Sequence, residues 1–179
     1  MRQPPLTYKL AFIGEPGAGK TTCIDALSDF PVVSTDVECT DELAQIKKTT
    51  TVALDYGEMN LGEQGRLLLY GLPGQSRFDF MMDVVKENLV GIVLLVDAQS
   101  RAPISGLTAT LDAHRDTLFE YPFVAVINKA QDDANDLKQQ TTAALRRYGM
   151  VAPVLNMDVR RRDELARIFD LLFLCAEHA

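Results

Sequence analysis

The sequence predicts an α/β domain in which helices cover both faces of a mostly parallel six-stranded sheet with one antiparallel strand. Apolar runs alternate with helix-like patterns along the chain, which is typical of parallel sheets that are buried on both faces. A glycine-rich segment, residues 14–21, separates the first apolar run from the first helical pattern. Residues 60–65 form a short polar turn between the second and third strands, and a connection this short makes those two strands antiparallel.

Each element follows from its own pattern. The six predicted strands are residues 8–14, 52–59, 66–70, 90–97, 123–128 and 153–156. A first helix is predicted at residues 20–28, and four more where apolar residues recur at helical spacing. Their apolar positions are Phe78, Met81, Met82, Val85 and Leu89; Ile104, Leu107, Leu111 and Leu118, with His114 packed on the same stripe; Leu137, Ala144, Leu145 and Tyr148; and Leu165, Ile168, Phe169 and Leu172. Residues 29–50 are a polar connection long enough to indicate a functional loop.

Composition narrows the class of protein. The chain has 179 residues, which predicts a single domain over residues 1–179. No apolar run reaches about 18 residues, so we expect no membrane insertion. The three cysteines are scattered, which favours a reduced, cytoplasmic protein. A net charge of −7 argues against a nucleic-acid partner, and we expect residues 160–162, three arginines, to be a solvated helix start.

The segment that follows the first strand has the pattern G-x-x-x-x-G-K-T. Its glycines allow successive backbone N–H groups to face a phosphate, and the new helix adds its N-terminal donors. The lysine is expected to reach the β- and γ-phosphates, and the hydroxyl of Thr21 to bind Mg²⁺. The predicted phosphate-binding residues are Gly14, Glu15, Pro16, Gly17, Ala18, Gly19, Lys20, Thr21 and Thr22.

Other loops are expected to converge on this segment, because ligands bind at the carboxyl ends of parallel strands. Residues 71–76, 128–133 and 156–158 each follow a predicted strand. Residues 49–51 precede the antiparallel strand, which begins at the same edge of the sheet.

In order and spacing, these motifs resemble the Ras-like small GTPases over nearly the whole chain. Residues 51–56 resemble switch I, residues 71–78 resemble switch II, and Asn128-Lys129 resembles the guanine-recognition loop. The long switch I region and the Leu-Pro-Gly-Gln of switch II are most similar to bacterial gliding-motility and cell-polarity GTPases of the Mgl type and to conservon-type GTPases. The resemblance implies a GTP/GDP switch with slow hydrolysis, stimulated by a dimeric roadblock-type activating protein at the switch regions.

The resemblance also implies roles for individual residues. Mg²⁺ would be held by Thr21 and, in the triphosphate state, by Thr51. The Gly74 N–H would bond the γ-phosphate, and Gln75 would orient the attacking water, so that the catalytic set is Gln75, Lys20 and Thr51. At the other end of the nucleotide, Asn128 would tie its loop to the P-loop and Lys129 would lie over the base.

Two positions depart from the family pattern. Switch II of the superfamily opens with an aspartate that holds Mg²⁺ through water. In this chain Gly71 occupies that position. The chain resembles the Mgl-type proteins in lacking this aspartate. Losing such a contact weakens metal affinity by about 10- to 100-fold. The base-reading aspartate is replaced by Gln131, so either the neighbouring Asp132 substitutes for it or base selectivity is relaxed.

Two other functions stay open at this stage. The departures at Gly71 and Gln131 suit a nucleotide-binding interaction module with little or no hydrolysis. A P-loop kinase for a small metabolite is the third reading, but it leaves the Asn128-Lys129 loop without a purpose. For a switch, Phe80 and its neighbours are expected to form the partner surface, because one helical face needs only Phe78, Met81 and Met82; the alternative is that Phe80 packs on the neighbouring helix.

Overall fold

The computed structural model describes residues 6–37, 52–75, 79–131 and 134–177. Seven strands form one sheet in the order β2-β3-β4-β1-β5-β6-β7. The strands are β1 (Thr7–Gly14), β2 (Val33–Val37), β3 (Val52–Asn60), β4 (Arg66–Pro73), β5 (Leu89–Asp97), β6 (Phe123–Asn128) and β7 (Val154–Asn156). The helices are α1 (Lys20–Leu27), α3 (Asp79–Val85), α4 (Pro103–Ala113), α5 (Arg115–Glu120), α6 (Asn135–Arg147) and α7 (Arg162–Glu177), with a 3₁₀ turn, η1 (Gly62–Gln64), between β3 and β4.

The sheet confirms the predicted fold class. β4, β1, β5, β6 and β7 pair in parallel, and β3 is antiparallel to both of its neighbours. The strand count was wrong, because β2 lies inside the segment that we interpreted as a polar connection. β2 is an edge strand with one paired side, and its Val33 is 50% exposed, so no apolar pattern marks it.

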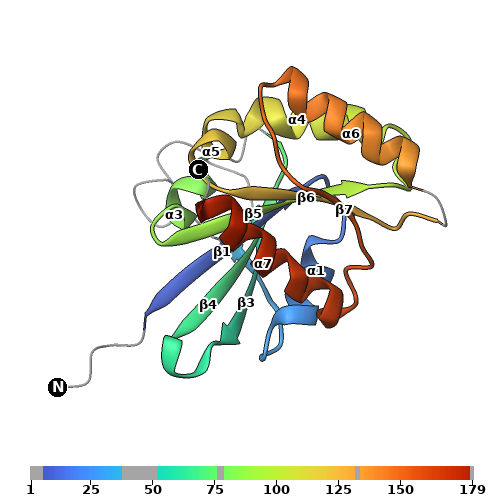
Figure 1. The fold of residues 1–179 in the computed structure, drawn as a ribbon. Coiled ribbons are helices and arrows are strands. Elements are labelled where there is room, and N and C mark those ends of the chain that lie inside the picture. The colour runs from blue at the N-terminus through green and yellow to red at the C-terminus, as the bar shows by residue number, and fades with distance from the viewer. Residues whose placement is uncertain (1–5, 38–51, 76–78, 132–133, 178–179) are drawn as a thin grey trace.

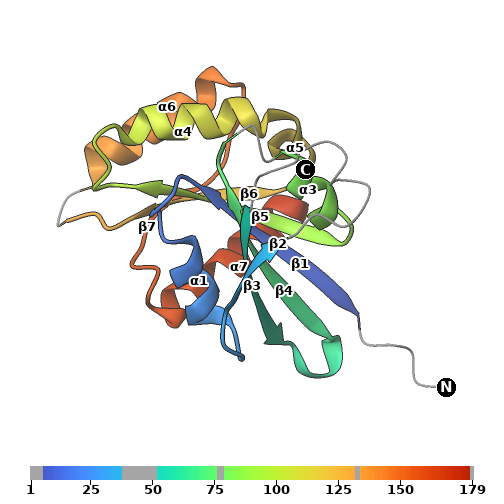
Figure 2. The ribbon, with the colours of Figure 1, turned by 180° about the vertical axis from the view of Figure 1, so that it is seen from behind.

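Helices cover both faces of the sheet (Figures 1 and 2). On one face, α3, α4, α5 and α6 pack on side chains such as Ala11 and Ile13 of β1. On the other face, α1 and α7 pack on Leu10 and Phe12 of the same strand. Successive side chains of a strand point to opposite faces of the sheet, and here both faces are buried. This explains why the central strands appear in the sequence as continuous apolar runs.

One expected helix is divided in two. The stripe from Ile104 to Leu118 spans both α4 and α5, with His114 between them outside helical geometry. His114 is buried, as expected, and its Nε2 lies 3.2 Å from the carbonyl oxygen of Pro73 at the end of β4. The break therefore places an imidazole against the end of β4, where the segment that resembles switch II begins.

The sheet brings the functional loops together at one edge. β1, β4, β5, β6 and β7 all end there, and β3 begins there, because it runs the opposite way. None of the helices in the described part of the chain is long and apolar enough to cross a membrane.

Candidate nucleotide site

The glycine-rich segment forms a tight loop between β1 and α1. Gly17 and Gly19 have φ values of +81° and +108°, in the region that side chains disfavour. The Ala18 N–H donates to the Glu15 carbonyl over 3.1 Å, and α1 begins at Lys20 with Gly19 as its N-cap. The predicted strand, loop and helix are therefore all present, and the first turn of α1 offers backbone donors to an anion.

The Lys20 side chain folds back onto the loop and bonds its backbone. Its ammonium donates to the carbonyl oxygens of Gly14 and Glu15, each over 2.8 Å. Burial lowers the pKa of Lys20, while the carboxylates of Asp55 and Glu15 act in the opposite direction. A phosphate bound in the loop would replace these neutral carbonyl partners of the ammonium by an anionic one, which adds an ion pair to the hydrogen bond.

Asp55 is a site residue that sequence reasoning missed. It lies on β3, where its Oδ2 accepts a short hydrogen bond from the Thr21 hydroxyl and its Oδ1 accepts one from Ser34 Oγ over 2.6 Å. It is paired in register with Gly71 of β4. The signal was present in the sequence, because counting back from the short turn between the two strands places these positions opposite each other.

The donors at this point fit a magnesium ion. Mg²⁺ is bound through one or two carboxylate or hydroxyl oxygens together with phosphates and several waters. Thr21 supplies a hydroxyl at the start of α1, and Asp55 supplies a carboxylate in contact with it. The second expected magnesium ligand, Thr51, lies outside the described residues.

The predicted base-recognition loop is joined directly to the P-loop. The side-chain amide of Asn128, which is 4% exposed, donates to the Ala18 carbonyl over 3.0 Å. Lys129 donates from its ammonium to the Gly17 carbonyl over 2.6 Å and to Asp97 Oδ2 over 2.7 Å. The tie that the resemblance implied for Asn128 is therefore present, and Lys129 adds a second one.

A pocket of about 810 Å³ opens between these loops. Pockets of about 300–1,000 Å³ are usual for small-molecule ligands. Of the expected residues, the pocket is lined by Gly17, Gly19, Thr22, Asn128, Lys129 and Gln131. Gln131 is exposed, while the alternative base-reading residue, Asp132, lies outside the described residues. Residues 156–158, one of the loops expected to converge here, also line the pocket, whereas sequence reasoning missed Gln99, Val159, Arg160 and Glu164.

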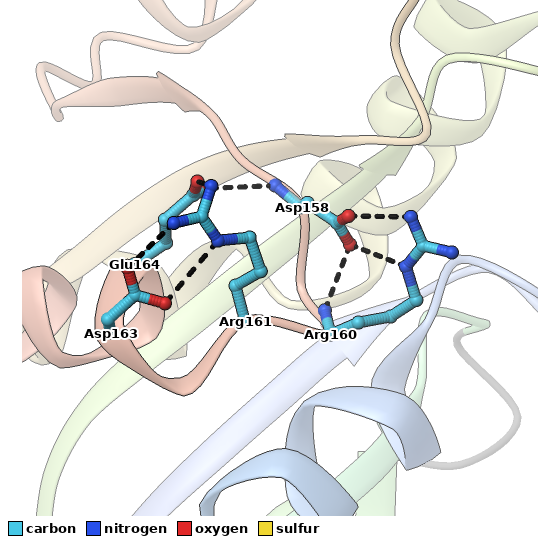
Figure 3. A network of polar contacts seen from close by, with 5 residues as sticks. All are labelled: Asp158, Arg160, Arg161, Asp163 and Glu164. Carbon is cyan, nitrogen blue, oxygen red and sulfur yellow. Dashed lines mark hydrogen bonds and ion pairs between the residues drawn. The ribbon is translucent and has the colours of Figure 1, made fainter.

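Charged side chains at and beside the rim of this pocket pair with one another (Figure 3). Arg160 donates from Nε and Nη2 to the two carboxylate oxygens of Asp158, over 2.8 and 2.6 Å. These hydrogen bonds lower the pKa of Asp158 to about 2, so its carboxylate is ionised at neutral pH. Arg161 pairs in the same way with Asp163 and Glu164.

The arginine cluster is therefore paired with carboxylates. The third arginine, Arg162, is the first residue of α7 and pairs with Asp29. The cluster lies at a helix start, as expected, and its charge is matched by acidic neighbours.

The segment that resembles switch II lies at the opposite end of the P-loop from the pocket. The Gly74 N–H donates to the Gly14 carbonyl over 3.0 Å, and a Cβ at Gly74 would lie 2.4 Å from Thr110 Oγ1 of α4. The role expected for this N–H requires it to exchange the Gly14 carbonyl for a γ-phosphate. Gln75 follows and is exposed.

The remaining site residues belong to the loop itself or fall beyond the description. Pro16 is exposed and Ala18 is buried, while Glu15 contributes its carbonyl to Lys20. Phe80 lies in α3, but its side chain is outside the described part of the chain, so the partner surface stays a prediction.

Comparison with solved structures supports the fold. The bacterial selenocysteine-specific elongation factor EF-Sec superposes with a TM-score of 0.60 and 16% identity, over 97% of this chain and 29% of that one. At this identity the likeness is one of fold. A match to the uncharacterized protein MJ1339 of Methanocaldococcus jannaschii is 28% identical over 91 residues. It spans 50% of this chain and 51% of that protein, so the chain covers about half of that relative.

A family model described as conserved hypothetical ATP binding protein matches residues 32–172. The matched stretch begins after the P-loop, so the motif and the family match are separate indications of nucleotide binding. Because it covers well over half of the chain, this P-loop protein belongs to the family of conserved hypothetical ATP binding proteins.

Proposed function

We propose that this chain is a guanine-nucleotide switch: it binds GTP and GDP with Mg²⁺ and hydrolyses GTP slowly. The observation that carries the proposal is the pair of hydrogen bonds that join the predicted base-recognition loop to the P-loop. Asn128 and Lys129 each donate to a P-loop carbonyl, at Ala18 and Gly17. A loop fixed in this way holds a base at a set position relative to the phosphates.

The two ends of the site suit a nucleotide that lies along the P-loop. The pocket borders Gly17 and Gly19, where a base and sugar would lie. Gly74 contacts the other end of the loop, at Gly14. A triphosphate would thus reach the switch II backbone with its terminal phosphate, while a diphosphate would end short of it.

A second candidate is adenine-nucleotide binding. The family description names ATP, and Gln131 offers a neutral amide where a carboxylate would favour guanine. Replacing a charged acceptor by a neutral one weakens each hydrogen bond by about 1 kcal/mol or more, so base selectivity is reduced on either reading.

Competition binding decides between the two bases. A fluorescent GDP analogue is displaced by GTP, ATP or XTP in the presence of Mg²⁺. We expect GTP to compete better than ATP, but by less than in GTPases with the aspartate. Stronger competition by ATP would reject the guanine assignment, and Lys20→Ala serves as the control that binding occurs in the P-loop.

Hydrolysis and partner stimulation are measured separately. We propose unassisted turnover below about one per minute, in line with the slow intrinsic rates of Ras-type proteins. We also propose that the chain belongs with the Mgl-type or conservon-type switches and that a roadblock-type protein at the switch regions raises this rate. Fast unassisted hydrolysis would contradict the switch, and an absence of turnover with any co-encoded partner would favour the interaction module.

A further inference from the structure

We propose that Asp55 takes over the magnesium-positioning role of the carboxylate that is missing at position 71. This inference rests on the proposed nucleotide function and concerns the same site. The missing group belongs on β4, and Asp55 stands on the neighbouring strand β3. Their backbones are register partners in the antiparallel pair, so the two positions lie side by side at the site edge of the sheet.

Gly71 leaves room for the Asp55 side chain. A Cβ built at Gly71 would lie 3.1 Å from the Asp55 Cβ and 3.4 Å from its Oδ2, and 3.2 Å from Ile24 Cδ1 of α1. Such distances are tighter than most real Cβ contacts. An aspartate at 71 and an aspartate at 55 would therefore compete for one space, and this chain fills that space from β3.

The contacts of Asp55 direct its charge at the expected metal ligand. One carboxylate oxygen accepts from the Thr21 hydroxyl, the group at the start of α1 that would bind Mg²⁺. The other oxygen accepts from Ser34 on β2. Among the described residues no ion pair of Asp55 is recorded, although its charge acts on the Lys20 ammonium in the P-loop. Such a carboxylate can accept hydrogen bonds from water molecules on a metal bound at Thr21.

A purely structural role for Asp55 makes a different prediction. If Asp55 served only to join α1, β3 and β2 through its hydrogen bonds to Thr21 and Ser34, it would stabilise the fold equally with and without metal. A positioning role instead makes nucleotide affinity depend on Asp55 mainly when Mg²⁺ is present. The magnesium dependence of GDP affinity separates the two roles.

The test is a magnesium titration of GDP binding. GDP affinity is measured by fluorescence at increasing Mg²⁺ and in EDTA, for the full chain and for Asp55→Asn, which keeps the size of the side chain and removes its charge. We expect the Mg²⁺ concentration for half-maximal effect to rise about 10- to 100-fold, the usual cost of losing a group that orients a metal's ligands, with little change in EDTA. Glu58→Gln on the same strand is the matched control, because Glu58 pairs with Arg66 and Tyr56 instead of with the P-loop.

A second variant, in which the carboxylate is moved from position 55 to position 71, completes the test. The double variant Asp55→Gly/Gly71→Asp removes the Cβ and the carboxylate from β3 and restores a carboxylate on β4, and we expect it to recover most of the magnesium response. If Asp55→Asn does not fold, this double variant decides alone: recovery supports the proposal and a lost response overturns it. An unchanged titration for Asp55→Asn, or equal weakening with and without Mg²⁺, also overturns it. Failure of the unmodified chain to bind GDP at all would instead reject the proposed function.

Discussion

Gly19→Ala should destabilise the protein more than Gly17→Ala, although both replace a P-loop glycine of positive φ. A Cβ at Gly17 meets nothing within 4 Å, so that substitution introduces backbone strain alone. A Cβ at Gly19 would lie 2.5 Å from the side-chain nitrogen of Asn128. That nitrogen is not free to move, because Asn128 is buried and donates to the Ala18 carbonyl.

The magnitude follows from these two terms. An L-residue in left-handed geometry costs about 1–2 kcal/mol, and this term applies to both variants. If the methyl group displaces the Asn128 amide, a buried donor and acceptor lose each other, at a cost of about 1–3 kcal/mol. We therefore expect a loss of about 1–2 kcal/mol in the free energy of unfolding for Gly17→Ala and about 2–5 kcal/mol for Gly19→Ala.

Urea unfolding of the nucleotide-free protein measures both values, provided that the variants share one m-value. The double variant Gly19→Ala/Asn128→Ala isolates the clash. It should be less destabilised than the sum of its single variants, because the amide that the methyl group displaces is already absent. Equal destabilisation at the two glycines, or strict additivity in the double variant, would refute the reasoning.

Three further predictions concern single side chains. Lys20→Ala should weaken GTP binding by roughly 10- to 100-fold or more, the value of a hydrogen bond to a charged group, and unchanged affinity in calorimetry would remove the phosphate-binding assignment. Thr141→Val should raise the free energy of unfolding by about 1 kcal/mol, because the Thr141 hydroxyl is buried without a hydrogen-bond partner among the described residues; lower stability in urea would reveal a partner. Burial raises the pKa of the Cys23 thiol to about 12, so in a Cys39→Ser/Cys175→Ser background a thiol reagent at pH 8 should label the folded protein far more slowly than the unfolded one, and equal rates would contradict this burial.

The central fold could be predicted because its signals are local. Continuous apolar runs mark β5 and β6, and glycines followed by Lys20 mark the turn into α1. β2 could not be found in this way, because an exposed edge strand needs no apolar face and is fixed by its pairing with β3. The break at His114 was not predicted either, and there the imidazole contacts the Pro73 carbonyl from a distant part of the chain.

The site was predictable where a motif defines it and not where strand pairing defines it. The Asn128 contact was expected from its motif and is present. Asp55 carries no motif, and its proximity to Thr21 arises only when β3 pairs with β4 beside the P-loop. The paired charges of Asp158 and Arg160 at the pocket rim likewise depend on how the chain turns from β7 into α7.

The Gly14 carbonyl joins the two elements that a switch has to couple. It accepts one hydrogen bond from the Lys20 ammonium over 2.8 Å and another from the Gly74 N–H over 3.0 Å. In the proposed function, a bound phosphate attracts Lys20 and so removes one of the two donors from this oxygen. Only a phosphate that extends to switch II offers the Gly74 N–H a better, charged acceptor in exchange. In the proposed switch, terminal-phosphate occupancy and the position of the Gly74 segment would thus be linked through a single backbone atom, and a two-state response would need no long chain of contacts.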